Sequence, residues 1–138
     1  MKIYAPTILL VEDNEDHAEL VKRGLEKNRI ANELIHVNDG EKAIDYLLSH
    51  NAPHLILLDL RLPKIDGLAV LKKIKTTPEL MKIPVVILTS SDSPNDIESS
   101  YSNYVNSYLV KPIDFSKFNR LLDDLGYYWL LCNKNPNP

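Results

Sequence analysis

Three acidic residues follow short apolar runs in this chain. Glu12 and Asp13 come directly after the apolar residues 8–11. Asp59 follows the apolar residues 55–58. Such short runs are typical of strands buried on both faces of a parallel sheet, and open α/β sheets bind ligands beyond the carboxyl ends of their strands. If the two strands are neighbours, three carboxylates meet there, which is unfavourable without a cation. The sequence therefore predicts a metal site, and the all-oxygen donor set favours Mg2+.

Two more polar residues stand at the ends of later apolar runs. Thr89 follows residues 85–88, and Lys111 follows residues 108–110. Both are expected at the same sheet edge as the acids. An Asp beside a metal ion can attack phosphorus and form an acyl phosphate. The ion, an ammonium and a hydroxyl would then stabilise the charge on the phosphoryl oxygens. Lys111 would pair with the free carboxylate before transfer and with the phosphoryl group after it.

The elements that position these residues follow an alternating pattern. Five short apolar runs alternate with amphipathic stretches, which is typical of βα units around a parallel sheet. We place the strands near residues 7–11, 33–37, 54–59, 84–89 and 106–110. The helices between them are expected to begin at the capping residues Asn14, Asp39, Ser93 and Asp114. The fourth helix carries only a weak apolar stripe, formed by Ile97, Tyr101 and Tyr104.

Length and composition exclude several classes of protein. A chain of 138 residues is expected to form one domain, and its net charge of −3 does not favour nucleic acid or anionic membranes. No apolar run reaches about 18 residues, and the start of the chain lacks the apolar stretch of a signal peptide. The single Cys132 excludes an internal disulfide and fits a reducing compartment. We therefore expect a cytoplasmic protein.

The ordered set of these residues resembles the receiver domain of two-component response regulators. The likeness rests on Glu12-Asp13, on Asp59 with its Pro-x-x-Asp-Gly loop at 63–67, on Thr89 and on Lys111-Pro112. It covers about residues 6–126, which leaves 127–138 as an aromatic and then Pro/Asn-rich tail with no output domain. The resemblance implies a flavodoxin-like (βα)5 fold, a doubly wound parallel sheet of strand order 2-1-3-4-5.

The resemblance also implies a chemical role for each site residue. Asp59 would accept a phosphoryl group from the phosphohistidine of a sensor histidine kinase, with Mg2+. Asp13, Asp59 and the backbone carbonyl of Arg61 would be direct metal ligands, and Glu12 would act through water. Such a protein promotes its own phosphotransfer and dephosphorylation but is not otherwise an enzyme.

The same resemblance implies a conformational switch. The Thr89 hydroxyl would move to the phosphoryl group, and Tyr108 would then rotate inward. The signal would pass to a downstream protein or to a histidine phosphotransfer protein.

A narrower resemblance is to the single-domain regulators that serve bacterial phytochrome kinases. It rests on residues 83–91, on Tyr101, on residues 106–111 and on the aromatic Tyr127-Tyr128-Trp129. It implies a phytochrome kinase as partner and favours a homodimer. The dimer would form through the face of Tyr101, Tyr104 and Tyr108 or through the aromatic tail.

Three other functions compete with this interpretation. A haloacid-dehalogenase-type phosphatase needs an acid two residues after its nucleophile, where this chain has Arg61. A flavodoxin-like electron carrier needs a phosphate-binding loop after the first strand, where Glu12-Asp13 would repel phosphate. A receiver-like interaction module that is not phosphorylated remains open. The four histidines show no ligand spacing and are expected to be structural or exposed: His17, His36, His50 and His54.

Overall fold

The computed structural model describes residues 6–27, 33–49 and 52–124. In these ranges strands and helices alternate as the sequence predicts. The strands are β1 (Thr7–Val11), β2 (Glu33–Val37), β3 (Leu55–Leu58), β4 (Val85–Thr89) and β5 (Ser107–Val110). The helices are α1 (Glu15–Lys27), α2 (Gly40–Ser49), α3 (Gly67–Thr76), α4 (Pro94–Ser102) and α5 (Phe115–Asp124).

All five strands are parallel and form one sheet of order β2-β1-β3-β4-β5. This order confirms the predicted doubly wound fold. β1 and β3 are direct neighbours, with Val11 opposite Leu58. The residues that follow, Glu12 and Asp59, therefore leave the sheet side by side. The reversal of strand order at β1 and β3 is also the point where such sheets bind ligands.

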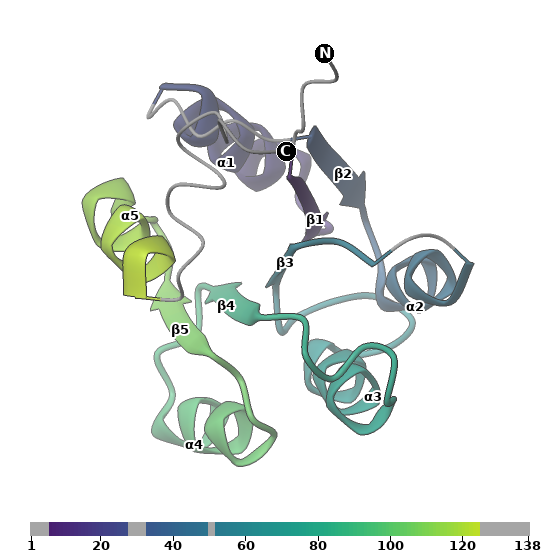
Figure 1. The fold of residues 1–138 in the computed structure, drawn as a ribbon. Coiled ribbons are helices and arrows are strands. Elements are labelled where there is room, and N and C mark those ends of the chain that lie inside the picture. The colour runs from purple at the N-terminus through teal and green to yellow at the C-terminus, as the bar shows by residue number, and fades with distance from the viewer. Residues whose placement is uncertain (1–5, 28–32, 50–51, 125–138) are drawn as a thin grey trace.

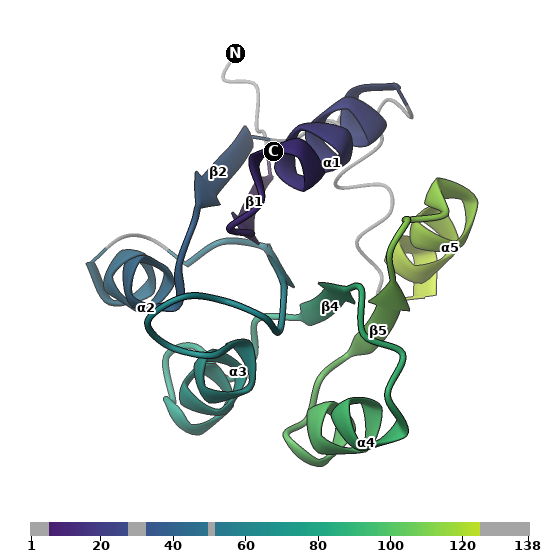
Figure 2. The ribbon, with the colours of Figure 1, turned by 180° about the vertical axis from the view of Figure 1, so that it is seen from behind.

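Helices cover both faces of the sheet, as Figures 1 and 2 show from opposite sides. α1 and α5 lie on one face, and α2, α3 and α4 lie on the other. Alternate strand residues supply the two cores: Ile8 and Leu10 pack with α1 and α5, whereas Leu9 and Val11 pack with α2 and α3. This alternation explains why the central strands are apolar at every position.

The predicted helix starts are confirmed by their hydrogen bonds. The side chains of Asn14, Asp39, Ser93 and Asp114 each accept a backbone N–H from the first turn that follows. The last three strands are shorter than predicted at their ends. Backbone pairing still continues past the assigned ends, because Asp59 N donates to Val11 O at 3.0 Å and Lys111 N donates to Thr89 O at 2.8 Å.

The apolar stripe predicted for the fourth helix is wrong. Tyr101 and Tyr104 are 50% and 77% exposed, and Tyr104 lies beyond the end of α4. The buried residues of α4 are the polar Asp96 and Ser100. Hydrogen bonds hold this inner face: Ser100 Oγ donates to the Asp96 carbonyl at 2.8 Å, and the Asp96 carboxylate has partners outside the helix.

The predicted C-terminal tail falls outside the described residues. The aromatic segment Tyr127-Tyr128-Trp129 lies wholly outside them, so its role and the boundary at 126 stay predictions.

Within the described ranges, no helix combines the length and apolar character that crossing a membrane requires.

Gly67 allows the loop after β3 to return onto the site. Its N–H donates to the Leu60 carbonyl at 2.9 Å, at the start of α3. A Cβ on this residue would lie 2.2 Å from the carbonyl oxygen of Asp59 and 2.5 Å from Leu60 Cα. Both contacts are with backbone, so neither can be relieved by rotating a side chain.

We predict that Gly67→Ala destabilises the protein by about 2 kcal/mol, because the backbone beside Asp59 must shift to admit the methyl group. The measurement is urea unfolding followed by circular dichroism. Ala69→Ser, an exposed change on the same helix, should stay within about 0.5 kcal/mol of wild type. Equal midpoints for Gly67→Ala and wild type would contradict the close approach.

Candidate phosphoryl-acceptor and metal site

Three carboxylates gather where β1 and β3 end. Oxygens of Glu12, Asp13 and Asp59 all lie within 4.8 Å of one another. Glu12 and Asp59 are buried, whereas Asp13 is exposed and leaves the cluster open to solvent on its side. Three hard oxygen donors at this spacing, one of them open to water, suit a divalent cation that keeps part of its hydration shell. The arrangement is therefore compatible with a metal site.

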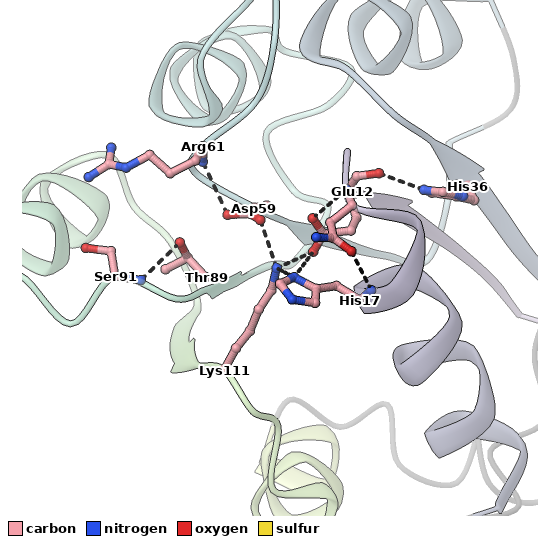
Figure 3. Close-up of polar contacts among 9 residues, drawn as sticks. Glu12, His17, His36, Asp59, Arg61, Thr89, Ser91 and Lys111 are labelled. Carbon is pink, nitrogen blue, oxygen red and sulfur yellow. Dashed lines mark hydrogen bonds and ion pairs between the residues drawn. The ribbon is translucent and has the colours of Figure 1, made fainter.

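Lys111 joins two of these acids from the end of β5. Its ammonium donates to Glu12 Oε1 and, at 2.9 Å, to Asp59 Oδ2 (Figure 3). The lysine side chain is only 12% exposed. Burying two carboxylates next to each other requires such a cation, because neither their charge nor their hydrogen bonding is satisfied by water.

The buried cluster shifts the pKa values of its members. Burial raises the pKa of Glu12 to about 7, against the opposing hydrogen bond from Lys111. Burial also acts to raise the pKa of Asp59, but the hydrogen bond and charge of Lys111 hold it below its ordinary value. For Lys111, burial acts downward, and the hydrogen bonds to both carboxylates raise its pKa overall. Asp59 is thus the acid that the lysine keeps ionised.

Thr89 and Tyr108 lie on the β4 and β5 side of the cluster. Thr89 is fully buried, and its Oγ1 accepts the backbone N–H of Ser91 at 3.4 Å. Among the described residues no hydrogen bond joins Thr89 to Asp59, as Figure 3 also shows. The Tyr108 hydroxyl donates to the Ser91 carbonyl at 2.8 Å. Both side chains thus contact the same residue of the β4–α4 loop.

Arg61 makes two separate contacts. Its backbone N–H donates to Asp59 Oδ1 at 3.2 Å, which helps to hold the carboxylate in place. Its guanidinium reaches away to α4 and pairs with Asp96 Oδ2 at 2.5 Å. Ser91 Oγ donates to the same oxygen at 2.5 Å. The loop after β3 is therefore tied to the start of α4.

Sequence reasoning missed the contact of His17 with the cluster. This side chain, expected to be structural or exposed, places Nδ1 2.9 Å from Lys111 Nζ. His36 agrees with that expectation, because it is exposed and its Nε2 donates to the backbone carbonyl of Glu12 at 2.7 Å. For His17 a signal was present, because it lies four residues before the buried Val21 and shares its side of α1. The pairing of Asp96 with Arg61 had no comparable signal.

A family model described as the response regulator receiver domain matches residues 8–123. The chain belongs to this family. This match confirms the predicted family. Its members are phosphoacceptors that interact with histidine kinases.

Individual relatives agree over most of their length. The probable methanogenesis regulatory protein FilR2 of Methanothrix harundinacea is 46% identical over 136 residues, which cover 95% of this chain and 88% of FilR2. Response regulator Rcp1 of Synechocystis sp. is 40% identical over 129 residues, which cover 89% of this chain and 88% of Rcp1.

Solved structures give the same result. The structure of the Mn2+-bound form of Rcp1 matches with a TM-score of 0.75 and 40% identity, covering 91% of this chain and 94% of that one. The phosphorylated cyanobacterial phytochrome response regulator RcpA matches with a TM-score of 0.77 and 38% identity, covering 92% and 95%. The predicted resemblance to phytochrome response regulators is therefore confirmed.

The raised pKa of Glu12 predicts a pH-dependent stability in metal-free solution. A folded-state pKa of about 7, above the ordinary 4.5, means that the folded state binds this proton more tightly than the unfolded state. The resulting stabilisation is complete below the unfolded pKa and is lost as the pH rises through about 7. We expect wild type to lose about 2–3 kcal/mol relative to Glu12→Gln between pH 5 and pH 8.

The measurement is urea unfolding in EDTA across this range. Asp59 does not contribute to the pH dependence in this range, because its pKa lies below the ordinary value of 3.8. For Glu15→Gln, an exposed change in the first turn of α1, the free energy of unfolding should depend on pH as in wild type. If the same holds for Glu12→Gln, the pKa of Glu12 is not raised in the folded protein.

Proposed function

We propose that this protein is a stand-alone two-component response regulator that accepts a phosphoryl group on Asp59 from a sensor histidine kinase. The observation that carries the proposal is the Lys111 ammonium, which bridges Asp59 and Glu12 within the carboxylate cluster. This geometry keeps one carboxylate ionised beside a cation, which is what a nucleophilic Asp requires.

The donor set fits Mg2+ as the resident ion. Asp13 and Asp59 would bind it directly, Glu12 would act through water, and the Arg61 backbone carbonyl would complete the protein ligands. When bound, the ion supplies charge stabilisation for the phosphoryl oxygens and relieves the repulsion among the acids. The relative Rcp1 has been solved in a Mn2+-bound form, which supports a divalent cation as the partner of the acids.

The chain's own residues then account for the transfer. An Asp59 oxygen forms a bond to phosphorus as the P–N bond of the phosphohistidine breaks, and the imidazole nitrogen keeps the electron pair. Lys111, already 2.9 Å from Asp59 Oδ2, would follow the developing charge on the phosphoryl oxygens. The Arg61 N–H would hold the other carboxylate oxygen during attack. The phosphorylated structure of RcpA supports this chemistry in a relative.

The output would be a change at Thr89 and Tyr108. A phosphoryl group adds negative charge close to Thr89. Among the described residues Thr89 Oγ1 accepts the backbone N–H of Ser91 at 3.4 Å, which leaves its hydroxyl hydrogen available to donate to a phosphoryl oxygen. Movement of Thr89 toward that group would remove an anchor of the β4–α4 loop. Tyr108 holds the carbonyl of the same loop residue, so the two side chains would respond together.

The partners follow from the family and from the exposed surface. The phytochrome regulators among its relatives support a bacteriophytochrome-type kinase as donor, with the output passed to a downstream protein or a histidine phosphotransfer protein. Exposed apolar area for the homodimer predicted from the sequence comes from Tyr101 in α4, Tyr104 after it and Val110 at the end of β5. We place the protein in the cytoplasm, with neither nucleic acid nor membrane as a partner.

The central test is the intact mass of the protein after incubation with acetyl phosphate and Mg2+. Wild type should gain one phosphoryl group, and EDTA should prevent the gain because the carboxylates then repel the incoming phosphate. Asp59→Asn should gain none, whereas Asp45→Asn, an exposed acid on α2, should behave like wild type.

The interaction module without phosphorylation is the competing function. Wild type that gains no mass from acetyl phosphate, and none from a phosphorylated histidine kinase, would favour it. A mass gain that persists in Asp59→Asn would leave the receiver assignment intact but move the acceptor to another residue.

Thr89→Ala tests the switch separately from the chemistry. We expect phosphorylation to continue at a reduced rate, because Asp59 and Lys111 are unchanged, while the response of the Tyr108 ring is lost. The measurement is the NMR spectrum of the Tyr108 ring with and without phosphorylation. Thr89→Ser keeps the hydroxyl and should keep the response. An undiminished Tyr108 response in Thr89→Ala would show that the signal does not pass through this hydroxyl.

A further inference from the structure

His17 occupies a place in the site that the proposed chemistry does not use. It is the third residue of α1, and its side chain is 38% exposed. Its ring nitrogen Nδ1 lies 2.9 Å from Lys111 Nζ. An ammonium has donors only, so this contact is a hydrogen bond from Lys111 to the lone pair of Nδ1. The ring is therefore in the tautomer that carries its hydrogen on Nε2.

This contact completes the coordination of the Lys111 ammonium. A lysine ammonium has three N–H groups, and here they meet three acceptors: Glu12 Oε1, Asp59 Oδ2 and His17 Nδ1. Glu12 directly follows β1, Asp59 directly follows β3, and His17 lies in α1. His17 Nδ1 is 4.0 Å from Glu12 Oε1, too far for a hydrogen bond, so each acceptor is separately available to the lysine.

The surroundings explain why the third acceptor matters. His17 and Lys111 both line a groove of about 370 Å³ between α1 and the start of α5. Much of the remaining lining is apolar, including Leu20, Val21 and Phe115. An ammonium N–H directed into such a wall would lose its water and gain no partner. His17 supplies the partner on this side.

From this geometry we propose that His17 is a positioning residue for the Lys111 ammonium. Two N–H groups fixed by Glu12 and His17 leave one direction for the third, and that direction is toward Asp59. The same N–H then meets whatever group Asp59 carries, without a rotation of the ammonium. Without His17 the ammonium keeps its charge but loses one of the two contacts that fix its orientation. The inference rests on the proposed phosphoryl transfer to Asp59.

The test uses three variants of the full chain. His17→Leu removes the acceptor while keeping an apolar side chain of similar size. His17→Asn restores an acceptor, because its side-chain oxygen lies at about the distance of Nδ1 from the backbone. Leu20→Ala is the matched control, since Leu20 lines the same groove and its side chain has no acceptor for the Lys111 ammonium.

Two quantities are measured for each variant. One is the exchange rate of the Lys111 ammonium hydrogens with water, observed by 15N NMR on the unphosphorylated protein. The other is the initial rate of phosphorylation by acetyl phosphate with Mg2+. For His17→Leu we expect faster exchange and phosphorylation slowed by about 10- to 100-fold, as for the loss of a hydrogen bond to a charged group. His17→Asn should recover most of both values, and Leu20→Ala should change neither.

Several outcomes would overturn the proposal. Unchanged phosphorylation in His17→Leu would show that the contact does not serve the reaction. Slower phosphorylation with unchanged ammonium exchange would show that His17 does not act through Lys111. Equal losses in His17→Leu, His17→Asn and Leu20→Ala would indicate a structural role of the groove.

The proposed function fails separately, and the two failures are distinguishable. If wild type accepts no phosphoryl group from acetyl phosphate or from a phosphorylated kinase, phosphoryl transfer itself is refuted. The ammonium exchange of His17→Leu, which needs no reaction, then shows by itself whether His17 holds Lys111.

Discussion

The site depends on one ammonium group held between two buried carboxylates. Glu12 and Asp59 end adjacent strands, so the topology brings their charges together whether or not this is favourable. Lys111, which follows the edge strand β5, donates to both carboxylates, but burial still raises the pKa of Glu12 to about 7. The remaining excess of negative charge is what a divalent cation would neutralise. Under the proposed function, metal affinity and phosphoryl chemistry would therefore share one origin, the crowding of acids at the switch point of the sheet.

The features that sequence predicted best are those set by strand topology. Residues that directly follow a buried strand are carried to a fixed edge, so Asp59 and Lys111 were placed together from their spacing alone. The features it missed are contacts between side chains of different helices and loops. The spacing of His17 to Val21 indicates which side of α1 it lies on, but its contact with Lys111 also depends on how closely α1 approaches the end of β5, which no local pattern encodes. The pairing of Asp96 with Arg61 was missed for the same reason. In the sequence Asp96 is an ordinary acid in the first turn of a helix, and only the fold brings Arg61 to it.

Two residues connect the carboxylate edge to the region of α4. One is Thr89, whose hydroxyl accepts the Ser91 N–H but makes no hydrogen bond to Asp59 in the described structure. The other is Arg61, whose N–H donates to Asp59 and whose guanidinium pairs with Asp96, which also accepts from Ser91. Both connections end at Ser91, the residue whose carbonyl also holds the Tyr108 hydroxyl. A local event at the carboxylate edge is thus connected to a residue that anchors both the helix and the aromatic side chain.

The polar inner face of α4 has a thermodynamic consequence. Because Asp96 and Ser100 are its buried residues, a shift of this helix would exchange hydrogen bonds and an ion pair while exposing little apolar surface. Apolar exposure is the main source of the heat-capacity change in protein transitions. The balance between two positions of α4 would therefore carry a small heat capacity and vary smoothly with temperature. It would be far more sensitive to ionic strength, which screens the half-exposed pairing of Arg61 with Asp96.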